Sequence, residues 1–122
     1  MLGKQQIQQS MAEITPSIAP ADQEIVLTFR SRLETMIPIL DLRVFGSRAR
    51  GDASEDSDLD LFIQVEMLDR PLRDSIHDLA WEVGFEYDRV ISTFVVTATQ
   101  VQEGAVGASP LLAKVLAEGI KI

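Results

Sequence analysis

The sequence predicts an α/β (α+β) domain in which helices cover a small mixed sheet of three to five strands. Segments with apolar residues at helical spacing follow segments in which apolar and polar residues alternate. The chain has 122 residues with 46% hydrophobic content, which is enough for one compact core. We expect residues 22–122 to form this domain and residues 1–21 to be a flexible or peripheral N-terminal segment.

The first half of the expected domain contains one helix and two strands. The helix begins near Asp22, a candidate N-cap, and ends before Pro38; its apolar residues recur at helical spacing. Residues 39–45 are short and apolar, as in a half-buried strand ended by Gly46. Residues 58–65 alternate with period two and form the next strand. The polar residues 48–57 between the strands have room for one helical turn. The N-terminal segment has room for a short helix near residues 7–14.

The second half of the expected domain contains two further helical segments, a strand and a short capped helix. Residues 72–83 carry a helical apolar stripe closed by Gly84, and residues 87–97 are rich in β-branched residues and form a strand. Thr97 or Thr99 could cap a short helix that follows. The last helix begins at Ser109 with Pro110 and stops at Gly119.

Composition excludes several classes of function. The chain has no cysteine, so it has no disulfide, thiolate metal site or cysteine nucleophile. No apolar run is long enough to span a bilayer, and no signal peptide is visible, so a cytoplasmic protein without membrane contact is expected. The formal net charge of −8 disfavours binding to long nucleic acids.

Asp58 and Asp60 are the strongest candidates for a metal site. Residues i and i+2 of a strand lie on the same face, so the two carboxylates project side by side. Such a pair is stabilised by a hard divalent cation, and Mg²⁺ typically takes one or two carboxylates while substrate phosphates complete its shell. The pair therefore predicts metal-assisted phosphate chemistry.

A phosphate-binding turn is expected next to this pair. Gly46 lets the backbone approach a ligand, and Ser47 can donate to phosphate oxygens from its hydroxyl and amide groups. Arg48 and Arg50 supply positive charge, although neutralising the acidic loop is an equally good interpretation.

Two competing motifs fail on their residues. Gly46 and Gly51 have the spacing of a P-loop, but Asp52-Ala53 stands where Lys-Ser/Thr is required. Residues 56–60 imitate the start of a calcium-binding EF-hand loop, but Leu61 replaces the turn glycine and Met67 the bidentate glutamate.

The pattern Gly46-Ser47, ten residues, then Asp58-x-Asp60 resembles the active-site motif of the DNA polymerase β-like nucleotidyltransferases. Within that superfamily the chain is similar to the minimal nucleotidyltransferases, many of which pair with HEPN toxins. The resemblance covers roughly residues 25–122, and residues 41–63 carry most of its specificity. It implies the nucleotidyltransferase fold and Mg²⁺-dependent transfer of a nucleoside monophosphate from an NTP to a hydroxyl.

The resemblance also assigns roles to residues. Asp58 and Asp60 match the catalytic, metal-binding carboxylates, with two Mg²⁺ ions and ATP as the NTP. Gly46 and Ser47 match the triphosphate contacts, and Ser57 lies in the polar loop of the motif, so that Ser57, Arg48 and Arg50 complete the predicted nucleotide site.

The third carboxylate of the family is assigned to Asp88, as metal ligand and base toward the acceptor hydroxyl. Its expected strand would place it on the face of Val90 and Ser92, with Glu86 as reserve. Arg89 follows Asp88 and could pair with it instead, so a capping or ion-pairing role for Asp88 stays open.

Two hypotheses about function follow. The first is a nucleotidyltransferase acting on a partner protein, an antitoxin that adenylylates a HEPN toxin by family analogy. The alternative is a catalytically weak or inactive module with the same fold that binds and neutralises or scaffolds a partner. A homo-oligomer is compatible with both, and transfer to a small molecule is a weaker third hypothesis.

Two aromatic residues of the 72–83 helix have no catalytic assignment. His77 is interpreted as a surface or partner-contact residue. Trp81 is interpreted as a packing residue, and an exposed position would instead indicate an interface.

Overall fold

The computed structural model describes residues 18–103 and 109–122. Their elements, in chain order, are α2 (Pro20–Leu33), β1 (Asp41–Phe45), α3 (Ser47–Arg50), β2 (Leu59–Val65), α4 (Arg70–Tyr87), β3 (Ile91–Thr97), α5 (Ala98–Glu103), α6 (Pro110–Glu118) and β4 (Ile120–Lys121). The predicted mixed α/β class is confirmed. The helix expected near residues 7–14, and most of the expected N-terminal segment, lie outside the described residues.

The strands form one mixed sheet in the order β3-β2-β1-β4. β1 pairs antiparallel with both β2 and β4, whereas β2 pairs in parallel with β3. The parallel pair is connected by α4, as a parallel connection requires a crossover. The order leaves β3 at one edge of the sheet, and β2 at its centre.

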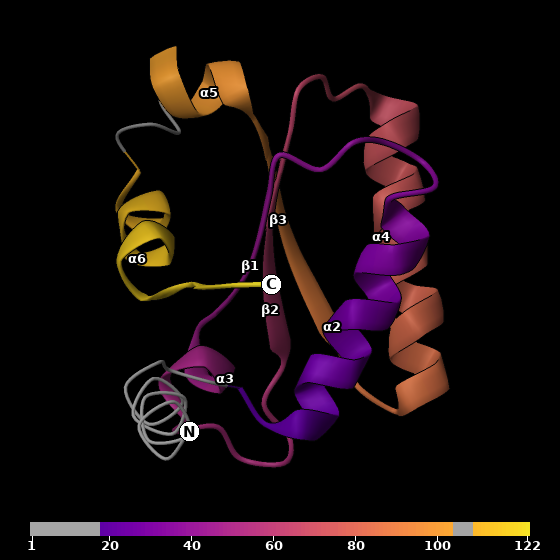
Figure 1. Cartoon of the computed structure of the whole chain (residues 1–122), viewed down its shortest axis with the longest axis vertical. Coiled ribbons are helices and arrows are strands. Elements are labelled where there is room, and N and C mark those ends of the chain that lie inside the picture. Colours follow the sequence, from indigo (N-terminus) through magenta and orange to yellow (C-terminus); the bar gives the residue numbers. More distant parts are fainter. Residues whose placement is uncertain (1–17, 104–108) are drawn as a thin grey trace, which may run out of the picture.

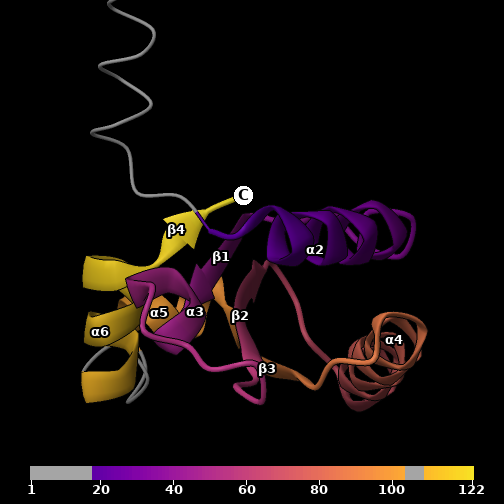
Figure 2. The ribbon, with the colours of Figure 1, turned by 90° about the horizontal axis from the view of Figure 1, so that it is seen from below.

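Helices cover both faces of the sheet. Figures 1 and 2 show α2 and α4 together on one side and α5 and α6 on the other. The main core lies under α2 and α4, where buried side chains of β2 such as Leu59, Leu61 and Ile63 pack. On the other face Phe62 packs with Leu112 and Val115 of α6. Alternation along β2 therefore sends Asp60, in phase with Phe62, toward the α6 side.

Helix α2 ends at Leu33, earlier than the expected end before Pro38, and two further boundary differences bear on the site. Helix α2 begins at Pro20, so Asp22 lies in its first turn and is not the N-cap. Helix α4 does not stop at Gly84 but continues to Tyr87, and Asp88 caps it in the left-handed conformation. A side chain at position 84 would meet the Arg89 carbonyl oxygen at 2.5 Å, so this glycine serves close packing rather than termination.

Other expectations about caps are confirmed. The Thr97 hydroxyl accepts a hydrogen bond from the Gln100 amide at the start of α5, and Ser109 caps α6 with its side chain. The short strand β4 was not predicted. Within the described ranges, no helix combines the length and apolarity needed to cross a membrane.

Candidate active site

The turn after β1 brings Gly46 against Asp60. Phe45 and Asp60 are directly paired across β1 and β2, and Gly46 follows with φ of 75° and ψ of −156°. This backbone region is essentially restricted to glycine. A Cβ on Gly46 would collide with the carboxylate of Asp60. Ser47 then begins the short helix α3, so its amide and that of Arg48 belong to a first turn, where N–H groups have no partner within the helix.

The two predicted carboxylates lie close enough to interact. Burial raises the pKa of Asp60 above its usual range, the nearby charge of Asp58 raises it further, and Arg50 lowers it. Asp58 is exposed just before β2, and Asp60 is half-buried within it. A carboxylate that is desolvated beside a second one is stabilised by a cation, so this pair has the electrostatics of a cation site.

Gly46→Ala should damage both the fold and the site. The new methyl group would strain the backbone and displace the Asp60 carboxylate, and we expect a loss of about 1–3 kcal/mol in unfolding free energy. Urea unfolding measures it. Gly51→Ala is the matched control, because Gly51 also has a positive φ, of 84°, but a Cβ there would meet nothing within 4 Å. Equal losses in stability, with Mg²⁺-ATP binding intact in both variants, would contradict the close approach.

Arg48 holds the loop that precedes Asp58. Its guanidinium donates to the Ser57 carbonyl oxygen at 2.8 Å from Nη2 and to the Glu55 carbonyl oxygen at 3.2 Å. The loop is closed further by Ser57, whose Oγ accepts from the Ser54 amide at 3.0 Å. Arg48 and Ser57, both predicted to bind nucleotide, are thus engaged in shaping the loop in this structure.

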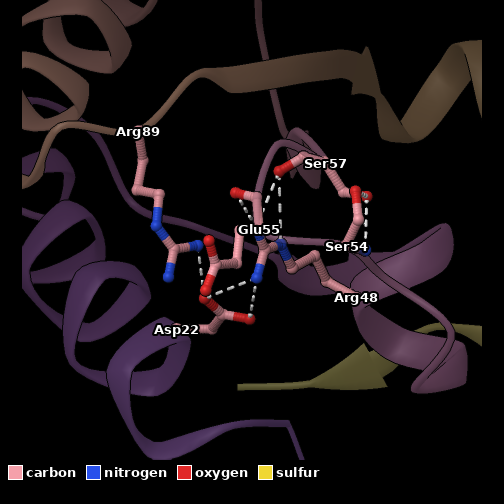
Figure 3. Close-up of polar contacts among 6 residues, drawn as sticks. All are labelled: Asp22, Arg48, Ser54, Glu55, Ser57 and Arg89. Atoms are coloured by element: carbon pink, nitrogen blue, oxygen red, sulfur yellow. Dashed lines mark hydrogen bonds and ion pairs between the residues drawn. The ribbon is translucent and has the colours of Figure 1, made fainter.

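Asp22 lies between the guanidinium groups of Arg48 and Arg89, as Figure 3 shows. Its carboxylate is 2% exposed and accepts from Arg89 Nη1 at 2.7 Å and from Arg48 Nη1 at 3.3 Å. The Arg48 side chain is itself only 8% exposed. Three segments far apart in the sequence therefore meet at one buried acid. Sequence reasoning missed this role, although Asp22 falls in phase with the apolar stripe that continues at Ile25 and Val26.

Arg50 lies on the other side of the turn. It pairs with Asp52 at 3.3 Å and with Glu118 of α6 at 3.6 Å, and its side chain is 37% exposed. Its charge is also felt at Asp60. Of the two predicted arginines, Arg50 is the one whose side chain remains accessible near the carboxylates.

The structure corrects the expected setting of Asp88. Strand β3 begins only at Ile91, so Asp88 is the left-handed cap of α4 and does not lie on a strand face with Val90 and Ser92. The residue paired with Asp60 on β3 is Ser92. Among the described residues, no group of three or more His, Cys, Asp or Glu side chains could hold a metal ion.

The expected neighbours of Asp88 also have other partners. Arg89 pairs with Asp22 rather than with Asp88. Glu86, the reserve choice, lies in α4 and pairs with Arg32 of α2 at 2.7 Å. Asp88 is therefore not withdrawn into an ion pair with the arginine that follows it.

A cleft of about 960 Å³ opens between α4, the acidic loop and the start of β3. Asp58 and Asp88 both line it but Asp60 does not, so the structure brings Asp88 to the same cavity as one member of the carboxylate pair and not into one cluster with both. The remaining lining residues include the predicted loop residue Ser57, together with His77, Trp81, Phe85 and Ser92.

The family to which this arrangement belongs follows from the sequence itself. Residues 26–100 match the family described as nucleotidyltransferase domain, and this range contains the turn, both carboxylates and the cleft. The chain belongs to this family. It is accordingly a nucleotidyltransferase by domain class.

Solved structures agree with the fold of a nucleotidyltransferase. A toxin–antitoxin crystal structure with AMP-PNP is 21% identical, with a TM-score of 0.56 over 80% of this chain and 69% of that one. A mutant of the toxin–antitoxin MntA-HpeT is 20% identical, with a TM-score of 0.55 over 82% and 70%. A candidate minimal nucleotidyltransferase is 30% identical over 78% of this chain and 93% of that one, with a TM-score of 0.46. No curated protein gave a match.

Proposed function

We propose that this nucleotidyltransferase transfers a nucleoside monophosphate, AMP from ATP, to a hydroxyl group of a partner protein with the help of Mg²⁺. The observation that carries the proposal is the Asp58–Asp60 pair, in which Asp60 lies against Gly46 of the Gly46-Ser47 turn. In that position the phosphates of a nucleoside triphosphate can accept hydrogen bonds from backbone and hydroxyl donors, and the accompanying metal ion can bind the carboxylates.

The donor set fits Mg²⁺. Two neighbouring carboxylates supply the hard oxygen ligands that this ion prefers. Burial and the nearby charge of Asp58 raise the pKa of Asp60, so a cation bound there would be favourable. Asp58 and Asp60 would hold the ion, with phosphate oxygens completing its shell. Bound there, Mg²⁺ would offset charge on the triphosphate and on the leaving pyrophosphate. The pair supports one ion directly, and a second would need ligands from the nucleotide.

Triphosphate contacts are assigned to the turn and to Arg50. Gly46 allows close approach, and Ser47 donates from its hydroxyl and amide groups. Arg50 adds a guanidinium that is still accessible beside the carboxylates. Arg48 and Ser57 contribute mainly by fixing the loop that carries Asp58, because the Arg48 guanidinium is engaged with Asp22 and with loop carbonyls.

The reaction requires a base as well as a metal site. The acceptor oxygen forms a bond to the α-phosphorus, the bond to the bridging oxygen breaks, and pyrophosphate leaves. The proton of the acceptor hydroxyl must be taken up, and Asp88 is our candidate base because it lines the same cleft as Asp58. In this assignment Asp88 acts on the acceptor and is not a metal ligand.

The partner is proposed to be a HEPN-like toxin, for which this chain would be the antitoxin. Two structures with the same fold are toxin–antitoxin structures, one of them with AMP-PNP.

The test combines binding with transfer. Mg²⁺-ATP at 100 times its dissociation constant should add about 2.7 kcal/mol to the unfolding free energy. With the product of the neighbouring gene present, intact-mass spectrometry should show the addition of AMP to that protein. EDTA should abolish both effects. A wild-type protein that shows neither a thermal shift nor a mass gain would overturn the proposal.

One observation favours a second candidate, a module that binds a partner without catalysis. The position beside Asp60 on β3 is occupied by Ser92, so the carboxylate pair has no third acid next to it on the neighbouring strand. This candidate predicts a thermal shift with Mg²⁺-ATP and a stable complex with the partner but no mass gain. The transfer assay therefore separates the two functions.

A further inference from the structure

Strand β3 presents an edge that could accept another strand. It is the outermost strand in the order β3-β2-β1-β4, and no strand of the described residues pairs with its outer side. Edge strands are normally blunted by charges, proline or bulges. The seven residues of β3, Ile-Ser-Thr-Phe-Val-Val-Thr, contain no charged residue and no proline. Within the described residues the outer backbone groups of β3 have no strand partner, and such an edge is a template for strand addition.

Exposed apolar side chains lie beside this edge. Trp81 is 70% exposed, Phe85 is 86% exposed and Val90 is 64% exposed, and all three line the cleft at the start of β3. Trp81 was interpreted as a packing residue, and its exposure contradicts this and supports the alternative of an interface. Trp81 and Phe85 are one helical turn apart on α4, so their rings lie on the same helix face. Clustered apolar exposure next to an open strand edge is typical of a binding surface.

The charge of the cleft selects the kind of partner. Its lining includes four acidic residues: Glu55, Asp56, Asp58 and Asp88. The lining also includes Arg89, but the Arg89 guanidinium is paired with Asp22. A second copy of this chain, at a net charge of −8, would bring like charges together. A partner segment with basic residues would complement them.

We infer that the cleft and the β3 edge together form the docking surface for the acceptor, an extended, basic segment of a partner protein that adds to β3 as a strand. This inference rests on the proposed function and names the form of its substrate. Because adjacent strands lie about 4.8 Å apart, an added strand would run roughly 10 Å from β2. A hydroxyl-bearing side chain paired with Ser92 would then lie on the same face of the sheet as Asp60, because Ser92 is paired with Asp60.

The experiment selects ligands without assuming the partner. The full chain is immobilised and screened against displayed random peptides about as long as β3. We expect the enriched peptides to alternate apolar and polar residues and to carry net positive charge. They should lose affinity about tenfold or more for the double variant Trp81→Ser/Phe85→Ser. The double variant Glu55→Gln/Asp56→Asn should lower the affinity for these peptides, mainly at low salt.

Met67→Ser is the matched control. Met67 is also exposed, at 77%, but it follows the opposite end of β2, so its replacement should leave peptide affinity unchanged. Hydrogen exchange supplies the direct readout of strand addition, since bound peptide should protect the amides of residues 91–97. Four outcomes would overturn the inference. They are protection of α4 amides alone, enrichment of acidic peptides, equal peptide affinity for the wild type and the Trp81→Ser/Phe85→Ser variant, and no enrichment of any peptide.

Two further measurements test whether a second copy of the chain or the nucleotide occupies this surface instead. Sedimentation of the free chain should give a monomer, because a dimer that dissociates in the Trp81→Ser/Phe85→Ser variant would make a second copy the occupant. The Mg²⁺-ATP thermal shift should be unchanged in that variant, because its loss would assign the rings to the nucleotide. Peptide binding without any Mg²⁺-ATP shift in the wild type would refute the proposed function and leave the docking surface standing.

Discussion

Asp58→Asn and Asp60→Asn should each lower the rate of nucleotidyl transfer by at least about 10²- to 10³-fold, the range expected when a group that stabilises transition-state charge is removed. Asn keeps the shape of the side chain but cannot offer a charged ligand, so the Mg²⁺-dependent part of ATP binding should be lost as well. Initial rates of AMP transfer and thermal shifts with Mg²⁺-ATP measure both effects. Transfer at the wild-type rate in either variant would refute the carboxylate site.

Without ligand, the thermal stability of Asp60→Asn should differ from that of the wild type in a pH-dependent way. A raised pKa means that Asp60 contributes stability when it is protonated, and this contribution is lost as the pH rises through its folded-state pKa. Asp60→Asn should therefore unfold at a higher temperature than the wild type at pH 7, and the gain should shrink as the pH falls toward the ordinary range of an aspartate. A variant with simple loss of packing would instead be less stable at both pH values.

Asp88→Asn distinguishes the proposed base from the proposed ligands. If Asp88 acts on the acceptor hydroxyl, transfer should fall by about 10²- to 10⁴-fold while the Mg²⁺-ATP thermal shift remains. Loss of both would place Asp88 with Asp58 and Asp60 as a metal ligand.

Asp22→Ala is expected to be the most destabilising of these substitutions. It leaves the guanidinium of Arg48, with its side chain only 8% exposed, without its carboxylate partner, and breaking a buried pair from one side costs about 3–5 kcal/mol. The Ser57 carbonyl would lose the anchored guanidinium that holds it, so residual transfer activity should also fall. Urea unfolding measures the free energy.

Asp52→Ala is the control for this prediction. Asp52 also pairs with an arginine, Arg50, but its side chain is 63% exposed, and such surface pairs contribute about 0–1 kcal/mol. Similar unfolding midpoints for Asp22→Ala and Asp52→Ala would show that the buried pair is not holding the fold.

Much of the fold follows from periodicity. The alternation in residues 58–65 predicts β2 because one face of that strand is buried under α2 and α4, and Ser109-Pro110 predicts the start of α6 because capping is local. The end of α4 could not be predicted in this way. Gly84 reads as a stop, but its lack of a side chain is used for close contact with the Arg89 carbonyl, a tertiary requirement that the local sequence does not reveal.

The site divides in the same way. Asp58 and Asp60 are predictable because strand geometry alone puts them on one face. Asp22 and Arg89 are not, since their contact joins segments 67 residues apart and depends on how α2 meets the end of α4. The strand position of Asp88 was wrong for a related reason: the prediction extended β3 backward over residues that the helix retains.

The antiparallel pairing of β1 with β2 has a consequence for how such a protein can change over time. Gly46, Ser47, Asp58 and Asp60 all belong to this single hairpin-like unit, whereas Trp81, Phe85, Asp88 and β3 belong to the segment that follows. If the proposed roles hold, divergence of the later segment at positions other than Asp88 would change partner choice and leave the proposed metal and phosphate contacts in place. Lineages that share this hairpin should accordingly differ most along α4 and the edge strand.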